Sequence, residues 1–238
     1  MAHRTQPETR LTLVLIGPPG AGKGTQAVRL AERYSIPHIS TGEILRAAVR
    51  IGSPLGAQVA ATLASGGLVS DGLMTDLVRE RLAQPDARPG FVLDGFPRTV
   101  VQAEALDEMI APSVPGSNPS LIVLLIAAAH EAIVQRLSRR RVCASCGITQ
   151  SVSEDTEPHA DPCPYCGGGL VRREDDEPTT IWRRLSTYAS FAEPITSLYR
   201  IRSRFASVDG LRHADEVTAA LCAHIDDVRA QTFGRSGR

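Results

Sequence analysis

Lysine is almost absent from this 238-residue chain: Lys23 is the only lysine among 26 basic residues, and all the others are arginine. Aromatic residues are also few, at 4%, and the 26 basic side chains are balanced by 26 acidic ones. Non-specific binding to nucleic acid or to an anionic membrane needs a clustered excess of positive charge. The neutral composition therefore predicts neither nucleic acid nor a membrane surface as a partner.

Long hydrophobic runs are missing as well. The longest apolar run is 121–129 (LIVLLIAAA), nine residues, whereas a bilayer-spanning helix needs about 20. The first ten residues are polar and lack the apolar stretch of a secretory signal. We therefore expect a cytoplasmic protein, and a chain of this length is expected to form one or two domains with a sizeable core.

The cysteines are few but regularly spaced. Cys143, Cys146, Cys163 and Cys166 form the pattern C-x2-C-x16-C-x2-C, and Cys222 lies far from them. In a chain without a secretory signal, two such pairs favour a tetrahedral metal site over disulfides, and we expect structural zinc. Iron is the alternative ion, and four free thiols or a redox pair are the alternatives to a metal. Cys222 is expected to be a core residue.

Short apolar runs alternate with helical patterns along most of the chain, which predicts an α/β fold with a parallel sheet covered by helices. The predicted strands are 11–16, 91–94, 121–126 and 207–210. The predicted helices are 24–34, 42–50, 55–64, 73–83, 99–110, 130–140, 178–198 and 216–230. Residues 141–176 are rich in cysteine, glycine, proline and acids, without apolar periodicity. We expect a bound metal to organise that segment.

A glycine-rich loop, 17–25 (GPPGAGKGT), directly follows the first predicted strand and opens the first predicted helix. This is the context that a phosphate-binding P-loop requires, because backbone N–H groups and the helix N-terminus face the phosphates. An ordinary turn is the alternative. Lys23 is predicted to reach the β- and γ-phosphates as a compact ammonium that arginine could not replace. The usual hydroxyl after the lysine is displaced by one position, from Gly24 to Thr25.

Four segments closely resemble adenylate kinases: GPPGAGKGTQ (17–26), STGEILR (40–46), GFVLDGFPRT (90–99) and RLSRRRVC (136–143). A further segment, REDDEPTTIWRRL (173–185), together with the four cysteines, resembles the long-lid, zinc-containing bacterial form. The resemblance extends from Leu11 to about Val228. It implies a P-loop nucleoside monophosphate kinase, usually monomeric, that catalyses ATP + AMP ⇌ 2 ADP with Mg²⁺. It also implies a core (1–39, 70–138 and 177–238), a helical AMP-binding domain (40–69) and a zinc-containing lid (139–176).

The resemblance assigns roles to individual residues. The expected ATP-binding residues are Gly20, Ala21, Gly22, Lys23, Gly24, Thr25, Arg140 and Arg212. The expected AMP-binding residues are Thr41, Arg46, Gly67, Leu68, Val69, Gly95, Phe96, Pro97, Arg98, Gln102, Arg173 and Arg184. The expected catalytic residues are Lys23, Arg98, Arg136, Arg140, Arg173 and Arg184.

The chemistry of phosphoryl transfer agrees with these assignments. The reaction asks mainly for two nucleotides in line and for neutralised charge, which arginine forks supply. Asp94, at the end of a predicted strand, suits a water-mediated contact to Mg²⁺. Gln102 can donate to and accept from the adenine edge. Asp175 and Asp176 are expected either to pair with neighbouring arginines or to form a solvated charged hairpin.

Two other functions are considered. A kinase for UMP, CMP or GMP is disfavoured by Gln102, the long lid and the four cysteines. A zinc-ribbon ATPase that binds nucleic acid should carry a basic cysteine module with exposed aromatics. Residues 143–170 contain no lysine or arginine, and Tyr165 is their one aromatic residue. Thr149 and Gln150 stand where many adenylate kinases carry an aromatic residue, which puts stacking on the ATP base in doubt.

Overall fold

The centre of the molecule is a parallel sheet of five strands in the order β2-β3-β1-β4-β8. The computed structural model describes residues 10–111, 120–152, 162–202 and 204–233. The sheet strands are β1 (Leu11–Ile16), β2 (His38–Ser40), β3 (Gly90–Asp94), β4 (Ser120–Ala127) and β8 (Arg204–Asp209). Because β1 pairs with both β3 and β4, its carboxyl end lies at the middle of one sheet edge.

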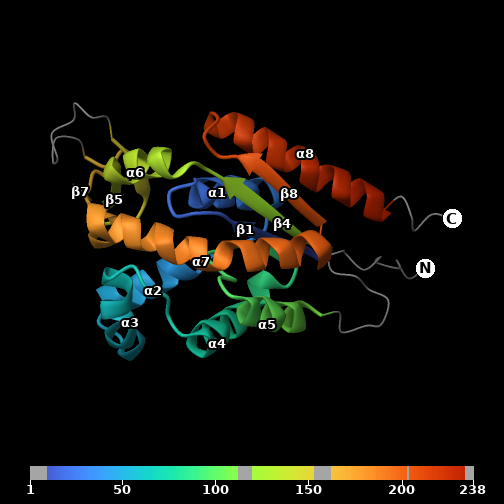
Figure 1. The fold of residues 1–238 in the computed structure, drawn as a ribbon, viewed down its shortest axis with the longest axis horizontal. Helices are drawn as coiled ribbons and strands as arrows, with labels where there is room; N and C mark the ends of the chain where they lie inside the picture. Colours follow the sequence, from blue (N-terminus) through green and yellow to red (C-terminus); the bar gives the residue numbers. More distant parts are fainter. Residues whose placement is uncertain (1–9, 112–119, 153–161, 203, 234–238) are drawn as a thin grey trace.

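Helices cover both faces of this sheet (Figure 1). Leu13 and Leu15 of β1 pack with α1 (Lys23–Tyr34) and α8 (Ala214–Phe233). Val14, between them, faces the other way, toward α4 (Asp71–Leu82), α5 (Val100–Ile110) and α7 (Pro178–Arg202). The alternation of side chains along a strand explains why one apolar run supplies two cores. The prediction of a parallel sheet covered by helices is confirmed.

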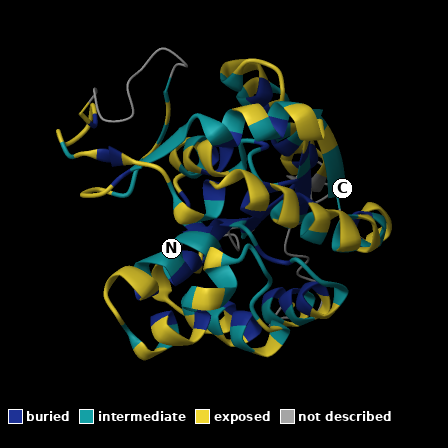
Figure 2. Ribbon diagram, turned by 60° about the vertical axis from the view of Figure 1, so that its left-hand side comes forward, coloured by how far each residue is buried: buried dark blue, intermediate teal, exposed yellow. Residues whose placement is uncertain are grey.

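Two smaller units lie beside the N-terminal half of α7 (Figure 1). One is the helical hairpin of α2 (Thr41–Arg50) and α3 (Pro54–Ala64). The other is a three-stranded antiparallel sheet of β5 (Arg140–Cys143), β6 (Thr149–Ser151) and β7 (Leu170–Val171), which α6 (His130–Ser138) precedes. Two short 3₁₀ turns, η1 (Pro85–Ala87) and η2 (Glu174–Asp176), complete the described elements. In the antiparallel unit the strands are mostly intermediate or buried, and the turns between them are mostly exposed (Figure 2).

The structure corrects several sequence expectations. The helix predicted over 130–140 ends at Ser138, because the chain turns there into the unpredicted strand β5. Strands β2, β6 and β7 were also missed. Although the cysteine segment lacks apolar periodicity, it has a small buried cluster of its own, formed by Cys143, Cys163 and Leu170. The last sheet strand is 204–209 rather than 207–210, and α7 continues to Arg202.

Most other boundaries agree with the predictions to within two or three residues. The tail at 1–9 and most of the loop predicted at 111–120 lie outside the described residues. Among the residues that the structure describes, no helix has the length and apolar character needed to cross a membrane.

Candidate active site

The loop between β1 and α1 has the backbone that a phosphate nest requires. Gly22 has a φ of +100° immediately before α1 begins at Lys23, a conformation that favours glycine. A Cβ atom on Gly17 would lie 2.3 Å from the carbonyl oxygen of Ile126, so the loop packs closely against β4. Within the described chain, no side chain caps the start of α1 through a hydrogen bond. The first N–H groups of the helix are therefore left for a ligand.

Lys23 folds back over this loop. Its Nζ atom donates hydrogen bonds to the carbonyl oxygens of Gly17 and Pro18 at 2.8 and 2.9 Å. Burial lowers the pKa of Lys23 to about 8; Asp94 opposes the shift, and Arg98 and Arg184 add to it. A buried ammonium among other cations is stabilised by an anion, which is the role predicted for this residue.

Five of the predicted arginines gather near Lys23. Arg98 and Arg184 reach it from the β3–α5 loop and from α7, and burial and mutual repulsion lower the pKa of each guanidinium. Burial lowers the pKa of Arg173 to about 10, and repulsion by Arg46 and Arg140 adds to the shift. Repulsion among buried cations is relieved when a polyanion binds between them. The cluster therefore has the electrostatics of a site for several phosphates.

Two carboxylates hold part of this cluster in place. Asp176 is fully buried, accepts two hydrogen bonds from Arg140, one of them at 2.6 Å, and a third from Arg184 at 3.0 Å. Asp175 pairs with Arg173 at 3.2 Å and with Arg184 at 3.1 Å. The alternative of a solvated charged hairpin is wrong, because both aspartates face arginines inside the protein.

A cleft runs from the P-loop between the α2–α3 hairpin and α7. Its lining includes Lys23 and many of the residues predicted for AMP, namely Thr41, Arg46, Gly67, Leu68, Val69, Gly95, Pro97, Arg98, Gln102 and Arg184. The side chains of Leu45 and Met74 add apolar wall next to Val69. An apolar slot with a few convergent polar groups is the usual form of a small-molecule site.

Gln102 lies in the first turn of α5 and is 1% exposed. Its Oε1 atom accepts a hydrogen bond from the backbone N–H of Arg98 at 2.7 Å, and its Nε2 atom donates to Asp71 at 2.8 Å. Asp71, the first residue of α4, was missed by the sequence analysis. A hydrogen bond across 31 positions has no local signature in the sequence.

Asp94 ends β3, directly beside the P-loop. Its Oδ2 atom would lie 3.7 Å from a Cβ atom on Gly24 and lies 3.9 Å from Nε2 of His38. Burial would raise the pKa of Asp94, but the neighbouring side chain of His38 and the charge of Lys23 lower it below its usual value. A carboxylate that is ionised next to a phosphate nest is chemically suited to hydrated Mg²⁺.

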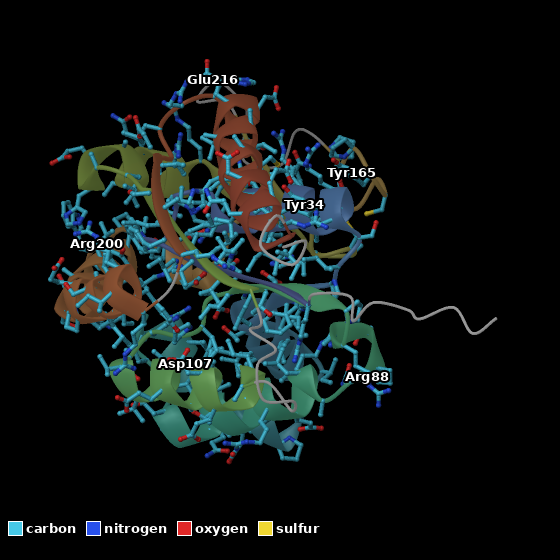
Figure 3. All side chains as sticks on the ribbon, turned by 90° about the vertical axis from the view of Figure 1, so that its right-hand side faces the viewer. Tyr34, Arg88, Asp107, Tyr165, Arg200 and Glu216 are labelled. Atoms are coloured by element: carbon cyan, nitrogen blue, oxygen red, sulfur yellow. The ribbon has the colours of Figure 1, made fainter. Side chains whose placement is uncertain are left out.

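Three predicted residues make contacts outside this arginine cluster. Arg136 donates to the backbone carbonyl of Gly210 at 2.6 Å. Arg212 is half-exposed and pairs at 3.1 Å with Glu216, which lies in the first turn of α8 (Figure 3). The Phe96 side chain is fully buried in the core that β3 shares with α5.

The four clustered cysteines come together as the spacing predicts. One sulfur from each of Cys143, Cys146, Cys163 and Cys166 lies within 4.8 Å of every other. The Cys143–Cys166 and Cys146–Cys163 sulfur distances are 3.4 and 3.7 Å. Four sulfurs at about 2.3 Å from a tetrahedral zinc lie roughly 3.8 Å apart, so the set fits this ion. Cys222, on α8, is buried in the core, as expected.

Comparisons with known proteins agree with this geometry. The adenylate kinase family model matches residues 15–204. The chain is 44% identical over 216 residues to a protein of Methanocella arvoryzae named adenylate kinase, covering 90% of this chain and 98% of that protein. It is 46% identical over 213 residues to the adenylate kinase of Trichlorobacter lovleyi, covering 90% and 98%. It is 43% identical over 216 residues to that of Thermodesulfovibrio yellowstonii, covering 91% and 99%. The chain therefore belongs to the adenylate kinase family, whose members are ATP:AMP phosphotransferases.

Proposed function

We propose that this protein transfers the γ-phosphoryl group of ATP to AMP in the cleft between the P-loop, the α2–α3 hairpin and α7. The observation that carries the proposal is the gathering of Lys23 and five arginines around one cleft in a protein of zero net charge. Four neighbouring carboxylates, Glu43, Asp94, Asp175 and Asp176, still leave positive charge in excess for phosphate oxygens. Such a cluster suits a reaction that needs positioning and charge neutralisation.

The test is a comparison of phosphate acceptors. Purified protein with MgATP should convert AMP to ADP far faster than it hydrolyses ATP, and faster than it phosphorylates UMP, CMP or GMP. A preference for one of those three nucleotides would contradict the proposal and favour another monophosphate kinase. Hydrolysis that exceeds transfer would contradict any kinase function.

The two nucleotides are assigned to opposite ends of the cleft. We place the ATP phosphates on the loop of 20–25 and on Arg140, with Arg212 near the ATP base. We place AMP against Thr41, Arg46, the segment 67–69, the segment 95–98 and Gln102. Support for the AMP side comes from the cleft lining and from the apolar wall beside Gln102.

The peripheral units are assigned the role of closing the site. We propose 40–69 as the AMP-binding domain and 139–176 as the lid, with the core made of 1–39, 70–138 and 177–238. Closure is needed because water competes with AMP for the phosphoryl group. Arg98, Arg136, Arg140, Arg173 and Arg184 are proposed to neutralise charge in the transition state with Lys23.

The proposed metal ions have separate roles. Mg²⁺ bound with ATP neutralises phosphate charge, and Asp94 would hold its hydration shell. Zn²⁺ bound by Cys143, Cys146, Cys163 and Cys166 would stiffen the lid, because four protein ligands leave no open position for chemistry. The sulfur distances support this ion at the cysteine site.

The proposal also includes a cytoplasmic monomer whose ligands are ATP, AMP and ADP, with no nucleic-acid partner. The closely placed cysteines that are free of disulfides favour a reducing compartment. Gel filtration tests the monomer, and binding of single-stranded DNA at micromolar protein would contradict the absence of a nucleic-acid partner.

A further inference from the structure

The side-chain amide of Gln102 is held by two protein groups of opposite character. The backbone N–H of Arg98 can only donate, and it faces Oε1 at 2.7 Å. The carboxylate of Asp71 accepts from Nε2 at 2.8 Å. Turning the amide by 180° would place two donors against each other and two oxygens against each other. These two partners therefore fix which end of the amide is oxygen and which is nitrogen.

The rest of Gln102 is equally constrained. Its backbone N–H donates to the side chain of Thr99, which caps α5, and the residue is 1% exposed. Gln102 lines the cleft, and Asp71 is not among the lining residues. Asp71 is thus linked to the cleft lining by its hydrogen bond to the amide of Gln102.

We propose that Asp71 is a positioning residue that sets the base specificity of the AMP site by fixing the orientation of the Gln102 amide. After its two protein contacts, the amide keeps one acceptor position on Oε1 and one N–H on Nε2. Adenine presents an N6–H donor beside the N1 acceptor, which complements this pair. Hypoxanthine presents the O6 acceptor beside the N1–H donor, which reverses it. This inference rests on the proposed placement of adenine against Gln102.

The structure offers a simpler role for Asp71, which the experiment must separate. As the first residue of α4, its negative charge also favours the helix N-terminus. That role predicts an equal loss of activity toward every acceptor nucleotide, whereas the orienting role predicts a change in the ratio between two bases. AMP and IMP are the decisive pair, because their bases differ only at the N1 and C6 positions.

The experiment measures kcat/KM for AMP and for IMP with MgATP in the full-length protein. With Asp71→Ala, only the Arg98 N–H still opposes turning of the amide, so efficiency with IMP should rise by up to about tenfold while that with AMP should stay level or fall. Asp71→Asn keeps an oxygen that can accept from Nε2, so it should change the AMP-to-IMP ratio less, by about threefold. Asp76→Asn is the matched control, because Asp76 lies on the same helix, is 75% exposed and pairs with Arg79. Its ratio should equal that of the wild type.

The outcomes separate this inference from the proposed function. Equal losses with both bases in Asp71→Ala, or an unchanged ratio, would overturn the orienting role. If Asp71→Ala does not fold, an unchanged ratio in Asp71→Asn overturns it instead. Gln102→Leu should bring the ratio close to one. If the AMP-to-IMP ratio falls to about one in Gln102→Leu but does not change in the Asp71 variants, the placement of AMP is supported and the role of Asp71 is rejected. An unchanged ratio in Gln102→Leu rejects both.

Discussion

Lys23, the only lysine in the sequence, lies in the P-loop, and its surroundings change its protonation. Its ammonium is buried between backbone carbonyls of the P-loop and arginines of the cleft, and burial holds its pKa at about 8. Burial among other cations therefore disfavours the charged form of Lys23 that phosphates need. Because the folded pKa is below the usual 10.5, this group contributes more stability as pH rises from about 8 toward 10.5.

The same shift predicts proton uptake on ATP binding. Above pH 8 the free enzyme holds Lys23 partly neutral, and bound phosphates should restore its charge, so ATP affinity should fall as pH rises through 8. Titration calorimetry at pH 9 in two buffers of different ionisation enthalpy should show about one proton taken up per ATP. Lys23→Met should lose this uptake. Equal proton uptake in the variant would show that another group titrates.

At the scale of elements, β5, η2 and α7 meet at one fully buried carboxylate. Asp176 of η2 receives Arg140 from the start of β5 and Arg184 from α7, so three elements meet at a single side chain. Removing one partner of a buried ionic network leaves the others uncompensated. The junction is therefore expected to contribute to stability far more than the exposed ion pairs around it.

Asp176→Asn should lower the free energy of unfolding by about 3 kcal/mol. Glu177→Gln is the matched control: Glu177 is the next residue, 56% exposed, and pairs with Arg172 at 3.5 Å. Loss of this exposed ion pair should lower the free energy of unfolding by less than about 1 kcal/mol. Denaturant unfolding measures both, and similar values for the two variants would contradict a special role of the buried junction.

The cysteine unit makes a separate prediction about the metal. The backbone N–H of Cys146 donates to the Cys143 sulfur and lowers the pKa of that thiol, whereas burial and the neighbouring sulfurs raise the pKa of Cys146. A metal ion is therefore needed to hold all four sulfurs as thiolates. Elemental analysis should find one zinc per chain. Removal of the metal with a chelator and a thiol modifier should lower the melting temperature by about 5 °C, equivalent to roughly 2 kcal/mol.

Cys222→Ala controls for the thiol modifier, because Cys222 lies on the buried face of α8, in a core separate from the cluster. This variant should keep its zinc and lose the same stability when the metal is removed. A protein without zinc, or an unchanged melting temperature after chelation, would contradict the structural metal.

At the scale of the whole molecule, the elements that could be predicted from the sequence are those with a clear apolar pattern. The runs of β1 and β4 are buried on both faces, and they were recognised for that reason. β2 has a single fully buried residue, Ile39, and the lid strands surround cysteines rather than an apolar face, so periodicity could not reveal them. Asp71 and Asp176 take part in contacts that depend on the folded arrangement, and no spacing rule identifies such partners.

The cleft itself is a property of the assembled molecule. The P-loop, the AMP-side segments and the arginines come from segments far apart in the sequence, and parallel pairing of β3 and β1 brings two of them to one sheet edge. That arrangement explains how a neutral chain offers a strongly cationic site, and it makes transfer between two bound nucleotides the function to test.

The most direct measurement follows the γ-phosphoryl group itself. With ATP labelled at the γ-phosphate and an excess of AMP, the label should appear in ADP at a rate far above its release as inorganic phosphate. Lys23→Met should fold normally and slow this transfer by about 10²-fold or more, because charge stabilisation of the transition state is lost. Label released mainly as inorganic phosphate, or near-wild-type transfer by Lys23→Met, would contradict the assignment of this cleft as the site of phosphoryl transfer to AMP.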